Sequence, residues 1–483
     1  MIGLEVHAQL LTASKAFCRC SAKFGEVPNS NVCPVCLGLP GALPVLNVNV
    51  VEFVLRVGLA TGCRIAHRSV FARKNYFYPD LPKGYQISQY EEPICSGGSL
   101  EIELPDGSKK SIGIKRIHME EDAGKSIHDL DIDTLVDINR CGVPLIEIVS
   151  EPELRSPQEA YQYLQRIRQI VTYLDVCDGN MEEGSLRCDA NVSVRRKGEQ
   201  SLGTKTELKN LNSFRFVEKG LEYEINRQIG LLESGKAIRQ ETLLWDAAAG
   251  IAIPMRSKEE AHDYRYFPEP DLVPVDVTDD WIDRVKHSLP EFPASRRDRY
   301  VRSLGLPSYD AEILTSEKGL ADYFEAVVAG LKAKNVQTYK MASNWIMTDI
   351  LHLINEQHKR IGECPVGPGR LADLINLIVD GTISGKIAKD VFEELRDSNE
   401  SPVMIVNKKG LLQVSDASSI ERAVDAVLDR YPEEVKSFLG GKQKVYGFLV
   451  GETMKDMKGK ANPGIVNDVL RKKLEERSKL TEK

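Results

Sequence analysis

Short segments in which apolar and polar residues alternate dominate the chain up to about residue 290, and Gly, Pro and Asn separate them. A period of two residues is typical of a β-strand with one buried face. Residues 2–9, 186–194 and 204–210 follow this pattern, and the apolar run at 145–149 is typical of a buried strand. We therefore predict a large β-rich domain over residues 1–290.

Two helices are predicted to interrupt this domain. Ser156, Pro157 and Glu159 form the start signal of the first, a capping box with proline at the first helical position. Apolar residues then follow at helical spacing, at Leu164, Ile167, Val171 and Leu174. The second helix is expected to run from about residue 214 to residue 235.

Helical periodicity becomes the main pattern after the prolines near residue 290. Residues 371–379 and 387–395 carry apolar side chains at spacings of three and four, which predicts a helical domain over residues 291–405. The stretch at 401–415 predicts a linker or an irregular turn. Two further periodic segments, at 420–428 and 465–474, predict a small helical tail domain over residues 406–483. The fold class is therefore expected to be α+β.

Composition places the chain among ordinary globular proteins. It has 483 residues, of which 42% are hydrophobic and 28% charged. No apolar run approaches the roughly 18 residues of a membrane span, and the N-terminus lacks the basic start and long apolar block of a secretory signal. We therefore expect a cytoplasmic protein without a membrane partner.

The charge of the chain is unevenly distributed. The formal net charge is −7, yet residues 441–483 contain eleven Lys or Arg against six Asp or Glu. A basic segment on an acidic protein indicates either a local anionic partner or the solvated face of a Lys-rich helix. The sequence leaves both interpretations open.

Four of the ten cysteines form two close pairs on either side of one loop. Cys18 and Cys20 lie in one pair, and Cys33 and Cys36 in the other. Two pairs of soft thiolate ligands at this spacing predict a structural zinc site, because four sulfur ligands leave no open position for catalysis. Free thiols, and redox chemistry of the second pair, are the alternatives.

Several charged residues stand where strands should bring them together. Glu5 and His7 share one face of the first strand, and Glu147 lies inside an apolar run where an unpaired carboxylate would be unfavourable. The acids Glu120 and Glu121 follow His118 and offer hard oxygen ligands for Mg²⁺. The alternative for each is a solvent-facing strand surface or turn.

Basic residues on neighbouring strands point to phosphate chemistry. Arg187 and Asp189 share the polar side of one strand, and Lys205 lies on the polar side of the next. Carboxylates for a metal, with Arg and Lys for phosphate, are the groups that phosphoryl transfer requires. The aromatic and basic segments at 73–80 and 263–269 fit stacking on a nucleic-acid end, or packing in the core.

Familiar nucleotide and hydrolase motifs do not account for the chain. Gly124-Lys125-Ser126 resembles the end of a P-loop, but Met119 stands where that motif requires glycine. We find no dinucleotide fingerprint, no zincin helix and no nucleophile elbow. Any ATP site must therefore be of another type.

Taken together, the segments resemble one known family over almost the whole chain. They are IGLEVH, CPVCLGLPGALPVLN, RKNYFYPDLPKGYQISQ, HMEEDAGKS, PLIEIVSEPE, MEEGSLRCDANVS, ELKNLNSF, DYRYFPEPDLVP, GFLVGETMK and GKANP. The family is that of the B subunits of the glutamyl/aspartyl-tRNA amidotransferases. The resemblance implies a cradle-shaped catalytic domain followed by a helical domain and a tail domain. It also implies an ATP-dependent carbon–nitrogen ligase that takes its nitrogen from glutamine and amidates misacylated Glu-tRNA(Gln) or Asp-tRNA(Asn).

The resemblance also implies roles for particular residues. It places Mg²⁺ on His7, Glu121 and Glu147, with Glu5 and Glu120 as neighbouring acids. Arg187, Asp189 and Lys205 are implied on the phosphate or substrate side. ATP is the implied phosphoryl donor.

Partners are implied in the same way. The sequence offers no recognisable glutaminase site, and the resemblance supplies an amidase-like A subunit as the ammonia source and a small C subunit, giving a heterotrimer. The basic tail is then expected to contact the tRNA body through Lys442, Lys444, Lys455, Lys458, Lys460, Arg471, Lys472 and Lys473. Two other functions stay open on the residues alone, a zinc-stabilised tRNA-binding scaffold without catalysis and a Mg²⁺-dependent hydrolase of nucleic acid.

Overall fold

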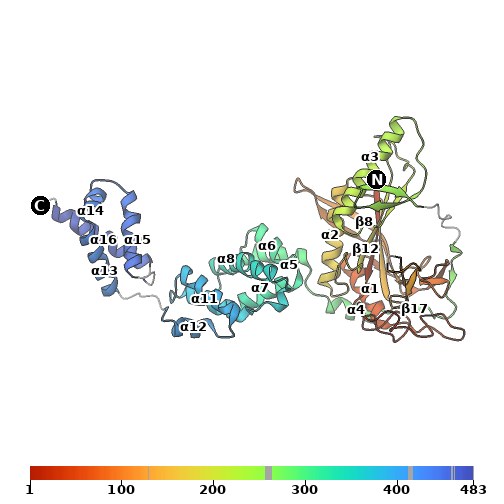
Figure 1. Cartoon of the computed structure of the whole chain (residues 1–483), viewed down its shortest axis with the longest axis horizontal. Coiled ribbons are helices and arrows are strands. Elements are labelled where there is room, and N and C mark those ends of the chain that lie inside the picture. The colour runs from red at the N-terminus through yellow and green to blue at the C-terminus, as the bar shows by residue number, and fades with distance from the viewer. Residues whose placement is uncertain (129, 256–263, 412–416, 458–460, 462, 482–483) are drawn as a thin grey trace. The chain divides into compact units, whose positions relative to one another are not determined.

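The structure is a computed structural model, and it describes residues 1–128, 130–255, 264–411, 417–457, 461 and 463–481 (Figure 1). The chain divides into two compact units, Met1–Pro293 and Ala294–Lys483. The first is β-rich and the second helical, which confirms the predicted α+β class. The finer division of the second unit at residue 405 stays a prediction.

A ten-stranded sheet forms the centre of the first unit, in the order β15-β14-β13-β12-β1-β11-β8-β6-β2, with β7 paired to β8. Its strands are β1 (Ile2–Gln9), β2 (Arg64–Ile65), β6 (Cys95–Ser96), β7 (Ser99–Glu103), β8 (Lys109–Glu121), β11 (Pro144–Ser150), β12 (Leu186–Val192), β13 (Thr206–Lys209), β14 (Thr242–Asp246) and β15 (Ile251–Pro254). All the pairs except β13 with β14 are antiparallel. The predicted strands at 2–9, 145–149, 186–194 and 204–210 are thus confirmed.

Three small sheets surround the large one. The strand pairs are β9 (Lys125–Ile127) with β10 (Leu135–Asp137), and β3 (Arg68–Ser69) with β17 (Val275–Asp276). The third sheet has the order β16 (Phe267–Pro268), β4 (Ala72–Asn75) and β5 (Tyr85–Ser88). It joins the two aromatic segments that the sequence singled out, because β4 and β16 are direct neighbours.

Helices cover the apolar face of the large sheet (Figure 1). They are α1 (Val48–Ala60), α2 (Pro157–Tyr173) and α3 (Phe214–Glu233), and α4 (Asp279–Ser288) packs on α1. Ile2, Leu4 and Val6 point into this core, whereas Glu5 and His7 alternate with them on the other face. The strict period of two in β1 therefore gives the sheet one apolar and one polar face.

The start of α2 follows the prediction with one difference. The Ser156 hydroxyl accepts a hydrogen bond from the Glu159 backbone nitrogen, as expected for an N-cap. The Glu159 carboxylate, however, accepts from the backbone nitrogen of Arg155 and not from that of Ser156. The predicted reciprocal capping box is therefore only half formed.

The named elements in the described part of the second unit are all helices. Its helices are α5 (Pro293–Leu304), α6 (Ser308–Leu314), α7 (Lys318–Gly330), α8 (Val336–Trp345), the π-helix η2 (Ile346–Ile350), α9 (Leu351–Glu356), the 3₁₀-helix η3 (Ile361–Glu363), α10 (Pro368–Val379), α11 (Gly385–Asp397), α12 (Pro402–Lys408), α13 (Ala417–Arg430), α14 (Pro432–Leu439), α15 (Lys444–Asp456) and α16 (Pro463–Thr481). One core contains Phe324 and Leu374, and a separate core contains Val424 and Leu470.

The predicted linker at 401–415 is wrong in its first half. Ser401 caps α12 by accepting from the Met404 backbone nitrogen, and Pro402 occupies the first helical position. Ile405 and Val406 are buried in the first helical core. Residues 412–416 lie outside the described part of the chain. Among the described helices, none is long and apolar enough to cross a lipid bilayer.

Candidate functional site

Four neighbouring strands align charged residues in one row across the polar face of the sheet. In the order β12-β1-β11-β8, Arg187 stands opposite His7, His7 opposite Glu147, and Glu147 opposite His118. Residues that face one another across a ladder lie on the same side of a sheet. The four side chains therefore meet on the face that the helices leave uncovered.

Glu120 completes this group from the next position on the same side of β8. Its Oε1 lies 3.5 Å from His7 Nε2, and a Glu147 oxygen lies 3.8 Å from the same nitrogen. One ligand atom from each of His7, Glu120 and Glu147 lies within 4.8 Å of the other two. We call these three residues the acidic cluster. An imidazole and two carboxylates at this separation could hold a metal ion.

The electrostatics of the acidic cluster favour ionised carboxylates. Burial alone would raise the pKa of Glu147, but His118, with its Nε2 3.1 Å away, and then His7 outweigh it and hold that pKa well below its ordinary value. Burial and then the Glu147 carboxylate raise the pKa of the nearby Glu5. The two acids therefore differ in how readily they bind a proton: Glu147 stays ionised to lower pH than Glu5.

Glu121 does not join the acidic cluster. It lies on the core side of β8, where its Oε1 accepts hydrogen bonds from Lys83 Nζ and, at 2.9 Å, from the Ile87 backbone nitrogen. Both members of the Lys83–Glu121 pair are buried. The structure does not bring Glu121 together with His7 and Glu147, because consecutive residues of a strand point to opposite faces.

The remaining predicted residues form a polar network beside the acidic cluster. Arg187 donates to Asp122 at 2.8 Å, and Lys209 donates to Asp189 at 2.6 Å. Asn191 links Glu5 and Lys205. It donates a hydrogen bond to Glu5 Oε1 at 3.0 Å and accepts one from Lys205 Nζ at 3.1 Å. Arg187 and Asp189 thus share the polar face with the cluster, and Lys205 reaches it through Asn191.

Two residues near the cluster did not enter the predicted set. His118 lies two residues before Glu120, a spacing that places both side chains on the same face of a strand. The sequence alone did not show whether this segment is a strand or an exposed turn. Lys74 lies under an aromatic wall, 4.8 Å from the Tyr264 ring centre. Burial would lower the pKa of Lys74, but Glu120 and other neighbours raise it, so the ammonium stays charged beside the acids.

The aromatic wall is built from both segments that the sequence marked. Tyr264 lies edge-on to Tyr76 and to Tyr266, with ring centres 6.1 Å apart in each pair. Tyr90 stacks on Tyr266 at 4.2 Å. Arg73 ties the segments together through its ion pair with the buried Glu269 at 2.7 Å. Tyr264 is the first described residue of its segment, since Asp263 lies outside the described part.

The four predicted cysteines converge as a second possible metal site. Cys36 Sγ lies 3.6 Å from the Cys18 sulfur, 3.7 Å from Cys33 and 3.9 Å from Cys20. The Cys18 hydrogen bond and then the Lys15 ammonium lower the pKa of Cys36 to about 4 against the effect of burial. A thiolate among three further sulfurs is compatible with a structural zinc ion.

The predicted tail residues occupy α15, α16 and the segment before them. Lys442, Lys444, Arg471 and Lys472 are exposed. Lys455 and Lys473 are engaged in ion pairs with Glu452 and Asp425, at 3.4 and 2.9 Å. Lys458 and Lys460 lie outside the described residues.

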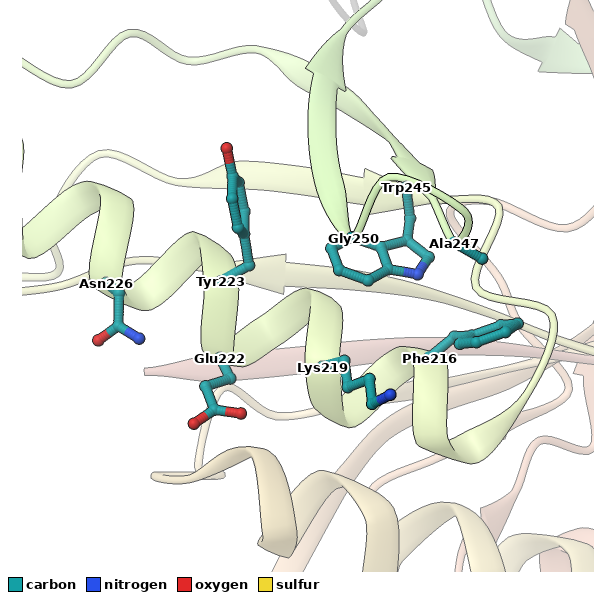
Figure 2. Close-up of a pocket in the computed structure, with 8 residues that line it drawn as sticks. All are labelled: Phe216, Lys219, Glu222, Tyr223, Asn226, Trp245, Ala247 and Gly250. Carbon is teal, nitrogen blue, oxygen red and sulfur yellow. The ribbon is translucent and has the colours of Figure 1, made fainter.

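A separate cavity of about 310 Å³ lies between α3 and the β14–β15 hairpin (Figure 2). Its lining residues are Phe216, Lys219, Glu222, Tyr223, Asn226, Trp245, Ala247 and Gly250. Figure 2 shows them coming from α3 on one side and from the hairpin on the other. No predicted site residue is among them, so the acidic cluster is not part of this cavity.

Comparison with known proteins decides the family. The model of the GatB/GatE catalytic domain matches residues 1–283, which include the acidic cluster and the four cysteines, and the model of the GatB domain matches residues 322–474. The chain belongs to the GatB family. The motif-based assignment to the B subunits of tRNA-dependent amidotransferases is thereby confirmed.

Relatives in this family match over nearly their full lengths. The chain is 58% identical over 477 residues to the B subunit of the aspartyl/glutamyl-tRNA(Asn/Gln) amidotransferase of Thermodesulfovibrio yellowstonii, covering 99% of each chain. It is 58% identical over 480 residues to that of Geobacter sulfurreducens, covering 98% of each. For Chlorobium phaeobacteroides the identity is 55% over 475 residues, with 98% of this chain and 99% of the relative covered. A GatB chain is one subunit of a multi-subunit ligase, so this protein has partner subunits.

Proposed function

We propose that the acidic cluster is where this subunit activates the side-chain carboxylate of a misacylated tRNA with ATP and then amidates it. The observation that carries the proposal is the convergence of His7, Glu120 and Glu147 within 4.8 Å on the open sheet face. Membership of the GatB family supports the reaction class. Glu-tRNA(Gln), Asp-tRNA(Asn) or both are the proposed substrates.

The proposed reaction has two steps. An oxygen of the Glu or Asp side chain attacks the γ-phosphorus of ATP, the bond to ADP breaks, and an acyl phosphate forms. Ammonia then attacks the acyl carbon, phosphate leaves with the bonding electron pair, and the nitrogen loses a proton to give the amide. Activation is needed because phosphate is a far better leaving group than the oxide of a free carboxylate.

His7, Glu120 and Glu147 fit a Mg²⁺ ion, in place of the set that included Glu121. Mg²⁺ is usually held by one or two carboxylates while phosphate oxygens and water complete its shell. When bound, the ion would neutralise part of the negative charge of the phosphate groups. The protein's own part is to keep Glu147 ionised, chiefly through His118, so that its carboxylate is available to a cation.

The cationic residues around the cluster are suited to hold phosphate. Arg187 and Lys209 are engaged with Asp122 and Asp189, so an incoming phosphate would compete for their donors. Lys74, beside the aromatic wall, adds a further positive charge. The aromatic rings above Lys74 give a flat surface on which a terminal base of tRNA can stack.

The four-cysteine site and the tail complete the proposal. Zinc is proposed as the ion of Cys18, Cys20, Cys33 and Cys36, with a structural role. An amidase-like A subunit is proposed as the ammonia source and a small C subunit as the third chain. The exposed cations of α15 and α16 are proposed to contact tRNA phosphates.

Reconstitution tests the function directly. The chain and its two partner subunits are incubated with Glu-tRNA(Gln) or Asp-tRNA(Asn), ATP, Mg²⁺ and glutamine, and the amino acid on the tRNA is identified. Formation of Gln-tRNA or Asn-tRNA that requires ATP supports the proposal. Binding of tRNA without ATP turnover would favour a scaffold, and ATP-independent cleavage of tRNA a hydrolase.

A further inference from the structure

A buried lysine lies among the four cysteines. Lys15 is fully buried, and its ammonium donates to the backbone oxygen of Asn31 at 2.8 Å and to Cys36 Sγ at 3.4 Å. A buried cation is strongly unfavourable without an anion beside it. The sulfur of Cys36 provides that anion when it is a thiolate ligand of a metal. No local pattern marks Lys15 in the sequence, because its partners are 16 and 21 residues away.

Lys15 and Glu121 both lie beside Gly142. Gly142 lies between the two residues, with a φ of +80°. A β-carbon at Gly142 would stand 3.5 Å from Lys15 Cδ and 3.7 Å from Glu121 Oε2. The backbone oxygen of Gly142 also accepts from Ala16 N at 2.8 Å, so this glycine is fastened to the segment that carries Lys15. Lys15 therefore lies next to both Cys36 and Gly142, the glycine beside Glu121.

A second, independent contact links the same two regions. Gly38 follows Cys36 by two residues and has a φ of +62°. A β-carbon on Gly38 would come within 2.7 Å of Lys83 Cγ and 3.0 Å of Lys83 Cα. The loop after Cys36 is thus packed directly against Lys83, the partner of Glu121. Glycine is required at this position both by the conformation and by the space.

We propose that Lys15 is a positioning residue that couples the four-cysteine metal site to the Lys83–Glu121 ion pair behind the acidic face. With the metal bound, Cys36 holds the Lys15 ammonium, and the cysteine loop presses Gly38 on Lys83. Glu121 is then held in line with Glu120, its neighbour in β8. Only the activity part of this inference rests on the proposed function.

The coupling has a spectroscopic consequence. A divalent ion with four thiolates carries two negative charges, and the Lys15 ammonium reduces this to one. A hydrogen bond from an ammonium to a thiolate also withdraws electron density from the sulfur. In the cobalt-loaded protein, loss of this bond should therefore move the sulfur-to-cobalt charge-transfer band to longer wavelength.

The test uses the full chain loaded with Co²⁺ and the variants Lys15→Met, Lys15→Arg and Lys23→Met. Lys23 is the matched control, an exposed lysine of the same loop. Lys15→Met is expected to shift the charge-transfer band and to raise the rate of metal loss to a chelator about tenfold. Lys15→Arg should bring the charge-transfer band and the rate of metal loss part of the way back to the parent values. Lys23→Met should match the parent protein in both measurements. A Lys15→Met spectrum and metal-loss rate equal to those of the parent would overturn the role of Lys15.

The second readout is turnover in the reconstituted assembly, with ammonium as the nitrogen source and metal in excess. Lys15→Met should lower kcat about tenfold while KM for the aminoacyl-tRNA stays unchanged. Gly38→Ala tests the other contact without touching Lys15, and it should lower kcat while the cobalt spectrum stays as in the parent. Unchanged kcat in both variants would overturn the coupling. An inactive parent assembly would instead refute the proposed function, and the cobalt measurements would still decide on Lys15.

Discussion

Glu120 and Glu121 are consecutive residues of β8, yet their carboxylates serve opposite faces of the sheet. Glu120 Oε1 lies 3.5 Å from His7 Nε2 on the polar face. Glu121 accepts from Lys83 and from the Ile87 backbone nitrogen at 2.9 Å on the core side. Glu120 therefore faces the acidic cluster, whereas Glu121 pairs with a buried lysine on the core side.

Substitution of these two acids should affect the stability of the fold to different extents. Glu120→Gln is expected to abolish ATP-dependent transamidation with little change in unfolding, because it removes a carboxylate from the acidic cluster. Glu121→Gln leaves the buried Lys83 ammonium without its anion, and should lower the free energy of unfolding by about 3 kcal/mol. Urea unfolding of the full chain and turnover of the assembly measure the two effects. Equal turnover in Glu120→Gln and the parent would remove Glu120 from the site.

His118 should set the metal requirement of the site. Its Nε2 lies 3.1 Å from Glu147, and it is the largest influence that lowers the pKa of that carboxyl. His118→Gln is therefore expected to raise the Mg²⁺ concentration for half-maximal turnover about tenfold, with smaller effects at saturating Mg²⁺. The control is His128→Gln, an exposed histidine near β9. A Mg²⁺ dependence that is the same in both variants would contradict the role given to His118.

The sequence predicted those parts of the site that follow from local periodicity. Alternation in β1 was enough to place Glu5 and His7 on one face, and the pair spacing was enough to group the four cysteines. The helix α12 was missed although Ser401 and Pro402 form an ordinary helix start. Patterns within a single strand or loop were thus sufficient to predict which of its residues lie together.

The remaining features depend on pairing between distant strands. The choice between Glu120 and Glu121 requires the register of β8 against β11, which places Glu147 opposite His118. The position of Lys74 depends on β4 lying beside β16, almost two hundred residues further along the chain. No local pattern encodes either register, since a shift by one residue exchanges the two faces of a strand.

Salt dependence should identify the tail residues that meet tRNA. Arg471 and Lys472 are exposed on α16, whereas the neighbouring Lys473 pairs with Asp425 at 2.9 Å. Replacing Arg471 and Lys472 together by Ala is expected to weaken tRNA binding and to reduce the slope of log K against log salt by about 2. Lys473→Ala is the matched comparison and should change the slope less. Binding is measured from about 50 to 200 mM salt. An unchanged slope in the double variant would exclude these two residues as phosphate contacts.

The helical unit should show a pH-dependent contribution from Glu325. Burial alone would raise its pKa, but hydrogen bonds from Arg296, Arg299 and Tyr300 lower it to about 2. Two of these bonds measure 2.8 Å, from Arg296, and 3.0 Å, from Tyr300. A carboxyl whose folded pKa is lowered stabilises the fold above its unfolded pKa near 4.3, and this contribution is lost as the pH falls towards about 2.

Glu325→Gln should therefore destabilise the unit near neutral pH and lose its effect in acid. Because 34% of the Glu325 side chain is exposed, water screens the interaction, and we expect a loss of about 1 kcal/mol at pH 7. Urea midpoints of the variant and the parent should move progressively closer as the pH is lowered from about 5 towards about 2. Glu312→Gln, an exposed acid on α6, should match the parent throughout. A difference that stays constant over this range would mean that packing, and not the charge of Glu325, accounts for the loss.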